Sequence, residues 1–193
     1  MLDARDLDSR AAFATSIARE AGRRLSVLRA SGRWPDAGVL GDVGDQAADG
    51  YLLGALFGRH PDDGVLSEET KDDAERLHRR VTWIVDPLDG TKEYATGRHD
   101  WAVHVGLAVD ERPALGVVAL PAIDRVLVAL AGGQDAGGVR VLGSAGEWPR
   151  QLAADRGPVR DRPLRLAASR SHTPAWMERF AAELGGAELV PCG

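Results

Sequence analysis

The feature that most constrains this chain is the stretch from Val81 to Thr91, which reads VTWIVDPLDGT. Val81 to Val85 is short, apolar and rich in β-branched residues, which is typical of a buried strand. Pro87 has no N–H group and a fixed φ, so we expect the strand to end at Asp86. Asp89 follows one tight bend later. Both carboxylates are therefore expected to face one cavity at the exit of the strand.

Gly90 and Thr91 complete a pattern suited to ligand binding. Gly90 has no Cβ and lets the backbone approach a ligand closely, while Thr91 offers a hydroxyl group. If a helix or turn begins here, the free N–H groups around both residues can bind an anion. A plain turn would explain each residue singly. However, two acidic side chains so close together repel each other, and this cost favours a site for hard cations and the phosphate they bind.

Composition and charge limit the class of protein. A length of 193 residues allows one or two domains with a real core. The net charge of −5 argues against a broad basic surface for nucleic acid or membrane. Cys192 is the only cysteine, which excludes an intrachain disulfide and fits a cytoplasmic protein. The sequence has no run of about 18 apolar residues that could span a membrane. Its first residues lack the basic start and the apolar run that are typical of a signal peptide.

Two helices are expected before the central stretch. Apolar residues at spacings of three and four predict an amphipathic helix over 9–28, with Asp8 or Ser9 as its cap. The Gly- and Pro-bearing segment 31–44 is predicted to be a loop. A second helix is expected to open at Asp45, which would be its N-cap, and to end at Gly58.

The strands on either side of the central stretch predict a sheet. A short strand is predicted over 64–66, and the acidic pair Glu68 and Glu69 follows it closely in the sequence. The segment 101–109 alternates between apolar and smaller or polar residues, which is the pattern of a half-buried strand. Further strands and a hairpin follow as far as residue 142, so we expect a mainly antiparallel sheet after two helices. His104 is expected to be an ordinary sheet histidine.

The chain is predicted to contain two domains. Residues 1–143 would form an α+β metal-binding domain, 144–162 a polar linker, and 163–193 the start of an incomplete C-terminal α/β domain. In the last part, a strand, a helix capped by Thr173 and a second strand indicate a βαβ unit.

Arg170 and His172 follow the first strand of that unit, at the edge where α/β sheets bind ligands. Turn and capping chemistry explains the segment 169–172 equally well. In the ligand-binding interpretation, Arg170 would meet a phosphate and His172 a ribose or base.

The hexapeptide over 86–91, with Ser67-Glu68-Glu69 upstream, resembles the inositol monophosphatase-like family of Mg²⁺-dependent, Li⁺-sensitive phosphatases. Within that family, the segments 92–94 and 169–172 resemble the CysQ-type 3′(2′),5′-bisphosphate nucleotidases. The resemblance implies a layered α/β sandwich of the inositol monophosphatase/fructose-bisphosphatase type. It also implies an incomplete second domain, because relatives continue past residue 193 to a further metal-ligating aspartate.

The resemblance assigns roles to residues of this chain. Mg²⁺ would be bound by the carboxylates of Glu68, Asp86 and Asp89 and by the carbonyl of Leu88. Asp45 and Thr91 would orient the attacking water. The residues expected to contact substrate are Glu68, Leu88, Asp89, Gly90, Thr91, Arg170 and His172.

The function implied by the resemblance is hydrolysis of the 3′-phosphate of 3′-phosphoadenosine 5′-phosphate, a step linked to sulfate assimilation. The expected partner is this small phosphate ester, not nucleic acid or membrane, and a homodimer is compatible with the family. Two alternatives stay open: an inositol or sugar monophosphate phosphatase of the same family, and a fragment that binds metal or phosphate without turnover. We expect the 193-residue chain alone to be weakly active or inactive.

Overall fold

The computed structural model describes residues 2–71, 74–131, 139–143, 150–152, 164–170 and 173–192. Contacts between Cα atoms divide the chain into two compact units, Met1–Ala154 and Asp155–Gly193. None of the described helices is both long and apolar enough to cross a membrane.

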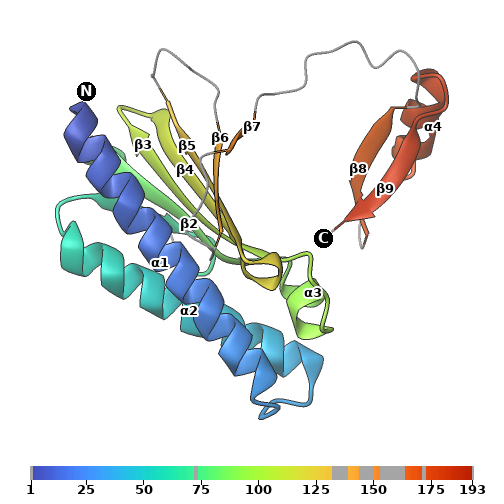
Figure 1. Cartoon of the computed structure of the whole chain (residues 1–193), viewed down its shortest axis with the longest axis horizontal. Helices are drawn as coiled ribbons and strands as arrows, with labels where there is room; N and C mark the ends of the chain where they lie inside the picture. Colours follow the sequence, from blue (N-terminus) through green and yellow to red (C-terminus); the bar gives the residue numbers. More distant parts are fainter. Residues whose placement is uncertain are drawn as a thin grey trace. The chain divides into compact units, whose positions relative to one another are not determined.

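The first unit is two long helices on one face of a sheet (Figure 1). Helices α1 (Ala4–Ala30) and α2 (Ala37–Arg59) pack against each other, α1 covers β3 to β5, and α2 covers β2. The sheet has seven strands in chain order, with β1 parallel to β2 and every later pair antiparallel. The strands are β1 Gly64–Ser67, β2 Val81–Asp89, β3 Ala102–Val109, β4 Arg112–Leu120, β5 Arg125–Leu130, β6 Val139–Gly143 and β7 Arg150–Leu152.

Alternation along the strands places the core between the sheet and the helices. Trp83, Val85, Val103 and Val105 are all at most 2% exposed. The alternation predicted for 101–109 is confirmed, because every second side chain of β3 faces the helices. Ile84, between two buried residues of β2, is 47% exposed and lies on the opposite face of the sheet.

Both helices begin earlier than predicted. Asp3 caps α1, because its carboxylate accepts a hydrogen bond from the Asp6 N–H at 2.8 Å. Asp36 caps α2 in the same way through the Val39 N–H at 2.9 Å. The predicted loop over 31–44 is therefore largely helical, and Asp45 lies inside α2 and is not its N-cap.

The strand β2 also continues further than predicted. It extends through Pro87 to Asp89, with Asp86 opposite His104 and Asp89 opposite Ala102. The register shifts between these two pairs. Pro87 thus interrupts regular pairing, as its missing N–H requires, without ending the strand.

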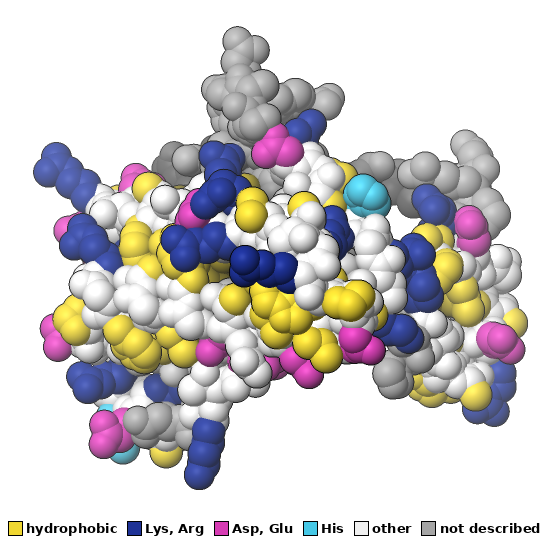
Figure 2. Space-filling view, turned by 90° about the horizontal axis from the view of Figure 1, so that it is seen from below, with side chains coloured by type: hydrophobic (Ala, Val, Ile, Leu, Met, Phe, Trp, Pro, Cys, Tyr) yellow, Lys and Arg dark blue, Asp and Glu magenta, His cyan; other side chains and the backbone are white. Residues whose placement is uncertain are grey.

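A short helix and two short 3₁₀ turns complete the first unit. Helix α3 is Thr91–Ala95, and the 3₁₀ turns are η1 Ala74–His78 and η2 Pro121–Ile123. The strand β7 lies within the stretch 144–162 that the sequence assigns to a linker. Figure 2 shows acidic, basic and hydrophobic side chains intermingled among the coloured residues of one face.

The second unit has the predicted βαβ order. Strands β8 (Arg165–Ser169) and β9 (Glu188–Cys192) are parallel, and helix α4 (Trp176–Glu183) connects them. The predicted cap is wrong: the N-cap position is Ala175, and the Thr173 hydroxyl donates to the Ser169 carbonyl at 2.5 Å.

Candidate functional site

Parallel pairing of β1 with β2 brings two acidic residues to the same level of the sheet. Ser67 lies opposite Val85, and the N–H of Glu68 donates to the Val85 carbonyl at 3.2 Å. Glu68 therefore leaves β1 beside the point where Asp86 follows Val85 on β2. The register of β1 with β2 thus brings together Glu68 and Asp86, which are far apart in the sequence.

Asp86 is half-buried and surrounded by negative charge. Burial raises its pKa to about 6, and the charges of Glu68 and Asp89 contribute in the same direction. His104 and the N–H of Leu88, which donates to Asp86 Oδ1 at 3.2 Å, act in the opposite direction. Glu68 and Asp89 are therefore both near enough to Asp86 for their charges to act on its carboxylate.

Asp89 lies at the exposed end of β2, next to a histidine of β3. Its Oδ2 is 3.6 Å from Nε2 of His104. The sequence predicts an ordinary sheet histidine at this position, and the structure places it at the edge of the acidic group. A protonated His104 would offset part of the negative charge on Asp89.

Asp45 projects from α2 toward the same region and is only 8% exposed. Burial raises its pKa to about 7, with Glu69 the largest charged contributor and smaller contributions from Asp86 and Glu68. The Thr91 side chain nearby lowers the pKa of Asp45 in part. The two residues to which the family resemblance assigns the attacking water are therefore in contact, although Asp45 does not cap its helix.

The turn between β2 and α3 is shaped by Gly90 and Thr91. Gly90 has a φ of +81°, and a Cβ there would lie 3.0 Å from the Asp100 carbonyl, so the position requires glycine. The Thr91 hydroxyl donates to the Leu88 carbonyl at 3.0 Å. A carbonyl oxygen has two lone pairs, so this bond leaves Leu88 with remaining acceptor capacity.

The donors gathered here fit a hard divalent cation by their chemistry. Glu68, Asp86 and Asp89 offer carboxylates and Leu88 a carbonyl, so all four candidate ligand atoms are oxygens, as Mg²⁺ prefers. Within the described part of the chain, no three His, Cys, Asp or Glu side chains are gathered closely enough to hold an ion as they stand. The four-residue ligand set accordingly stays a proposal, supported by donor type and electrostatic proximity.

Two further residues belong to this region. Glu69 is exposed, and its charge acts on Asp45 more strongly than that of Glu68. Asp49, one helical turn after Asp45, accepts hydrogen bonds from Ser67 and Thr70. Its spacing of four residues from Asp45 is the signal that places both carboxylates on one face of α2.

The predicted substrate contacts in the second unit are described only in part. The Arg170 guanidinium donates to the Pro191 carbonyl at 3.2 Å, and its backbone N–H donates to the Cys192 carbonyl at 2.9 Å. Both bonds attach Arg170 to the last two residues of β9. His172 lies outside the described residues.

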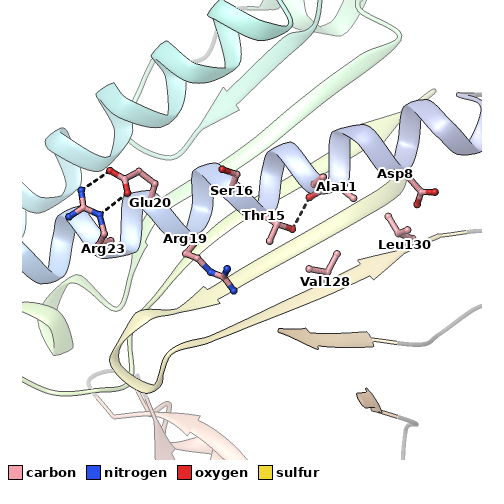
Figure 3. Close-up of a pocket in the computed structure, with 10 residues that line it drawn as sticks. Asp8, Ala11, Thr15, Ser16, Arg19, Glu20, Arg23, Val128 and Leu130 are labelled. Atoms are coloured by element: carbon pink, nitrogen blue, oxygen red, sulfur yellow. Dashed lines mark hydrogen bonds and ion pairs between the residues drawn. The ribbon is translucent and has the colours of Figure 1, made fainter. Parts of the chain in front are cut away.

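Two hollows of the first unit differ in their relation to the acidic group. One, of about 630 Å³, lies on the sheet face away from the helices and includes Glu68, Asp86 and His104 in its lining. The other, of about 760 Å³, lies between α1 and β5 (Figure 3). There Glu20 is paired with Arg23 and Thr15 with the Ala11 carbonyl, so polar groups of the lining already bind one another.

Two curated relatives of this chain have names that refer to bisphosphorylated nucleotides. A 3′-phosphoadenosine 5′-phosphate phosphatase of Mycobacterium leprae is 47% identical over 98 residues, which is 50% of this chain and 36% of the relative. The 3′(2′),5′-bisphosphate nucleotidase CysQ of Escherichia coli is 33% identical over 155 residues, 77% of this chain and 56% of the relative. The chain thus spans between about a third and somewhat over half of these proteins.

Solved structures of similar fold cover nearly the whole chain. CysQ from Bacteroides thetaiotaomicron matches with a TM-score of 0.75 and 26% identity over 96% of this chain and 73% of its own. The 2′-AMP-bound inositol monophosphatase II SaIMPase-II matches with a TM-score of 0.73 and 22% identity over 94% of this chain and 65% of its own. The inositol monophosphatase family model matches residues 7–174, a range that contains every described residue of the acidic group. The chain therefore belongs to the inositol monophosphatase family.

Proposed function

We propose that this chain provides the metal-binding half of a Mg²⁺-dependent phosphatase that hydrolyses the 3′-phosphate of 3′-phosphoadenosine 5′-phosphate to AMP. The observation that carries the proposal is the acidic group of Glu68, Asp86 and Asp89 beside the contact of Asp45 with Thr91. The names of the mycobacterial and enterobacterial relatives support the substrate. A small phosphate ester fits an acidic protein when bound cations supply the positive charge.

Glu68, Asp86, Asp89 and the Leu88 carbonyl would hold the metal. When bound, Mg²⁺ would supply positive charge that offsets the charge of the phosphate and would make water easier to deprotonate. Asp45 and Thr91, which lie close together, would orient the attacking water. The backbone of Gly90 and Thr91 would contact phosphate oxygens, since Gly90 has no Cβ to prevent close approach.

The first test is a phosphate-release assay on the 193-residue chain with and without Mg²⁺. The substrates to compare are 3′-phosphoadenosine 5′-phosphate, inositol 1-phosphate and fructose 1,6-bisphosphate. The proposal expects Mg²⁺-dependent release that is fastest from the nucleotide and is inhibited by Li⁺. Faster release from an inositol or sugar phosphate would contradict the proposed substrate. It would still be consistent with a phosphatase of the inositol monophosphatase family.

The second test separates binding from turnover. The chain covers 36% and 56% of the two curated relatives described above, so we expect slow turnover compared with a full-length relative assayed alongside. Calorimetry with Mg²⁺ alone then measures the metal site directly. Mg²⁺ binding without any phosphate release would support the alternative of a binding fragment, and no Mg²⁺ binding would remove the basis of the proposal.

The proposed function also includes a cytoplasmic location for the protein.

A further inference from the structure

Asp49 is a buried acidic residue that the proposed chemistry does not use. It lies on α2 one turn after Asp45 and is only 9% exposed. Burying a carboxylate is costly unless hydrogen bonds compensate it. Its surroundings therefore indicate what the residue is for.

Both oxygens of Asp49 bind the segment that carries Glu68 and Glu69. The Ser67 hydroxyl donates to Asp49 Oδ1 at 2.5 Å, and the Thr70 hydroxyl donates to Oδ2 at 2.9 Å. Ser67 is itself buried at 6% exposure, and its Oγ accepts the N–H of Glu69 at 3.3 Å. One carboxylate thus attaches to both ends of a four-residue segment, with the acidic pair between the two attachment points.

The same helix face serves a second segment of the site. Asp45 contacts Thr91 at the start of α3, while Asp49 contacts the end of β1. The rigid spacing of α2 therefore relates the position of Thr91 to the position of the acidic pair. Without the bonds to Asp49, like-charge repulsion would favour movement of the exposed Glu68 away from Asp86.

We propose that Asp49 is a positioning residue that holds the Ser67–Thr70 segment so that Glu68 faces Asp86 and Asp89. This inference rests on the proposed function, since it gives Asp49 a role in the affinity for Mg²⁺. Asp49 itself binds no metal in this proposal. It acts through two hydroxyl groups, as residues behind a metal ligand commonly do.

The test uses the full chain and the substitutions Asp49→Ala and Asp49→Asn, with Asp42→Ala as the matched control. Asp42 is an exposed carboxylate on the same helix, so its removal changes the charge equally without breaking these bonds. Calorimetry with Mg²⁺ alone is expected to give about 10- to 100-fold weaker binding for Asp49→Ala and unchanged binding for Asp42→Ala. Asp49→Asn, which keeps one acceptor oxygen, is expected to lie between.

A second measurement tests the anchoring in metal-free protein. Amide hydrogen exchange at Glu68 and Glu69 is expected to accelerate about tenfold or more in Asp49→Ala, while exchange in β3 and β4 stays unchanged. If Asp49→Ala does not fold, Ser67→Ala and Thr70→Val each remove one of the two bonds and are expected to show smaller effects of the same kind. Unchanged Mg²⁺ affinity in folded Asp49→Ala, or equal weakening in Asp42→Ala, would overturn the inference.

The two proposals fail in different ways. If the unsubstituted chain binds no Mg²⁺, the proposed function is wrong, and the role of Asp49 in Mg²⁺ affinity is wrong with it. If the unsubstituted chain binds Mg²⁺ but exchange at Glu68 and Glu69 is unaffected by Asp49→Ala, only the positioning role is wrong.

Discussion

At the scale of single residues, the carboxylates of Asp45 and Asp86 destabilise the metal-free folded protein when they are ionised. Asp45 has a pKa of about 7 and Asp86 a pKa of about 6, against a reference value of 3.8 for each. A carboxyl group whose pKa is raised by folding stabilises the folded state only while it is protonated. Its contribution is complete below the reference pKa and is lost as the pH rises through the folded value.

This linkage predicts the pH dependence of stability without metal. In EDTA, the free energy of unfolding should lose on the order of 2 kcal/mol from Asp45 as pH rises from about 4 to above 7, after allowance for solvent screening. Asp45→Asn stays neutral and should lack that loss. The measurement is urea unfolding across pH for both proteins. Asp42→Asn, an exposed control, should keep the unsubstituted slope, and an unaltered slope in Asp45→Asn would contradict the prediction.

A second prediction concerns Asp89. Asp89→Asn removes one negative neighbour of Asp86, so metal-free stability should stay equal or rise by up to about 1 kcal/mol. Mg²⁺ affinity should fall at least about tenfold, because a carboxylate ligand is replaced by a weaker amide ligand. Thermal unfolding in EDTA and Mg²⁺ calorimetry measure the two effects. Asp110→Asn, at the exposed ion pair with Arg80, is the control for charge. Unchanged Mg²⁺ affinity in Asp89→Asn would refute the ligand assignment.

At the scale of elements, α2 depends on glycines to approach α3. A Cβ on Gly41 would lie 2.9 Å from Thr91 Cγ2, and a Cβ on Gly44 would lie 3.0 Å from the Tyr94 ring. Glycine lowers the helix propensity of this part of α2. The close packing of α2 against α3 that the glycines allow offsets this loss of stability. The contact brings Asp45 and Thr91 together.

Alanine substitutions in α2 should separate these two effects. Gly41→Ala should destabilise the protein by about 1–2 kcal/mol, because the steric cost exceeds the gain in helix propensity. Gly54→Ala, where a Cβ meets nothing within 4 Å, should instead stabilise by up to about 1 kcal/mol. Chemical unfolding measures both. A stabilising Gly41→Ala would mean that α2 and α3 lie further apart than described.

The elements also differ in how far their sequences predict them. The alternation of 101–109 and the apolar run before Asp86 are local patterns, and both predict a strand correctly, although β2 continues to Asp89 instead of ending at Asp86. The start of α2 was not predicted because its glycines disfavour a helix locally, whereas the Asp36 cap and packing against α1 and α3 favour it. The bonds of Asp49 depend on a strand about 18 residues later, so no local pattern indicates them.

At the scale of the whole molecule, the two units differ in how much apolar surface they bury. The first has a continuous core between α1, α2 and the sheet. In the second, Ala168 and Ala181 are the buried apolar residues among those described, while Trp176 and Phe180 are 53% and 43% exposed. A two-stranded sheet with one short helix has little apolar burial to offset its conformational entropy.

This difference predicts unequal protection against hydrogen exchange. Backbone amides of β8 and β9 should exchange at least about 100-fold faster than those of β3 and β4, because small units with few buried contacts open at low free energy. Exchange measured by mass spectrometry on the intact chain compares the strands within one sample. Protection of β8 and β9 equal to that of β3 and β4 would contradict the prediction, since the second unit would then owe its stability to contacts beyond its own strands and helix. Mg²⁺ should leave the exchange of β8 and β9 unchanged while slowing exchange at Glu68, because the proposed ligands all lie in the first unit.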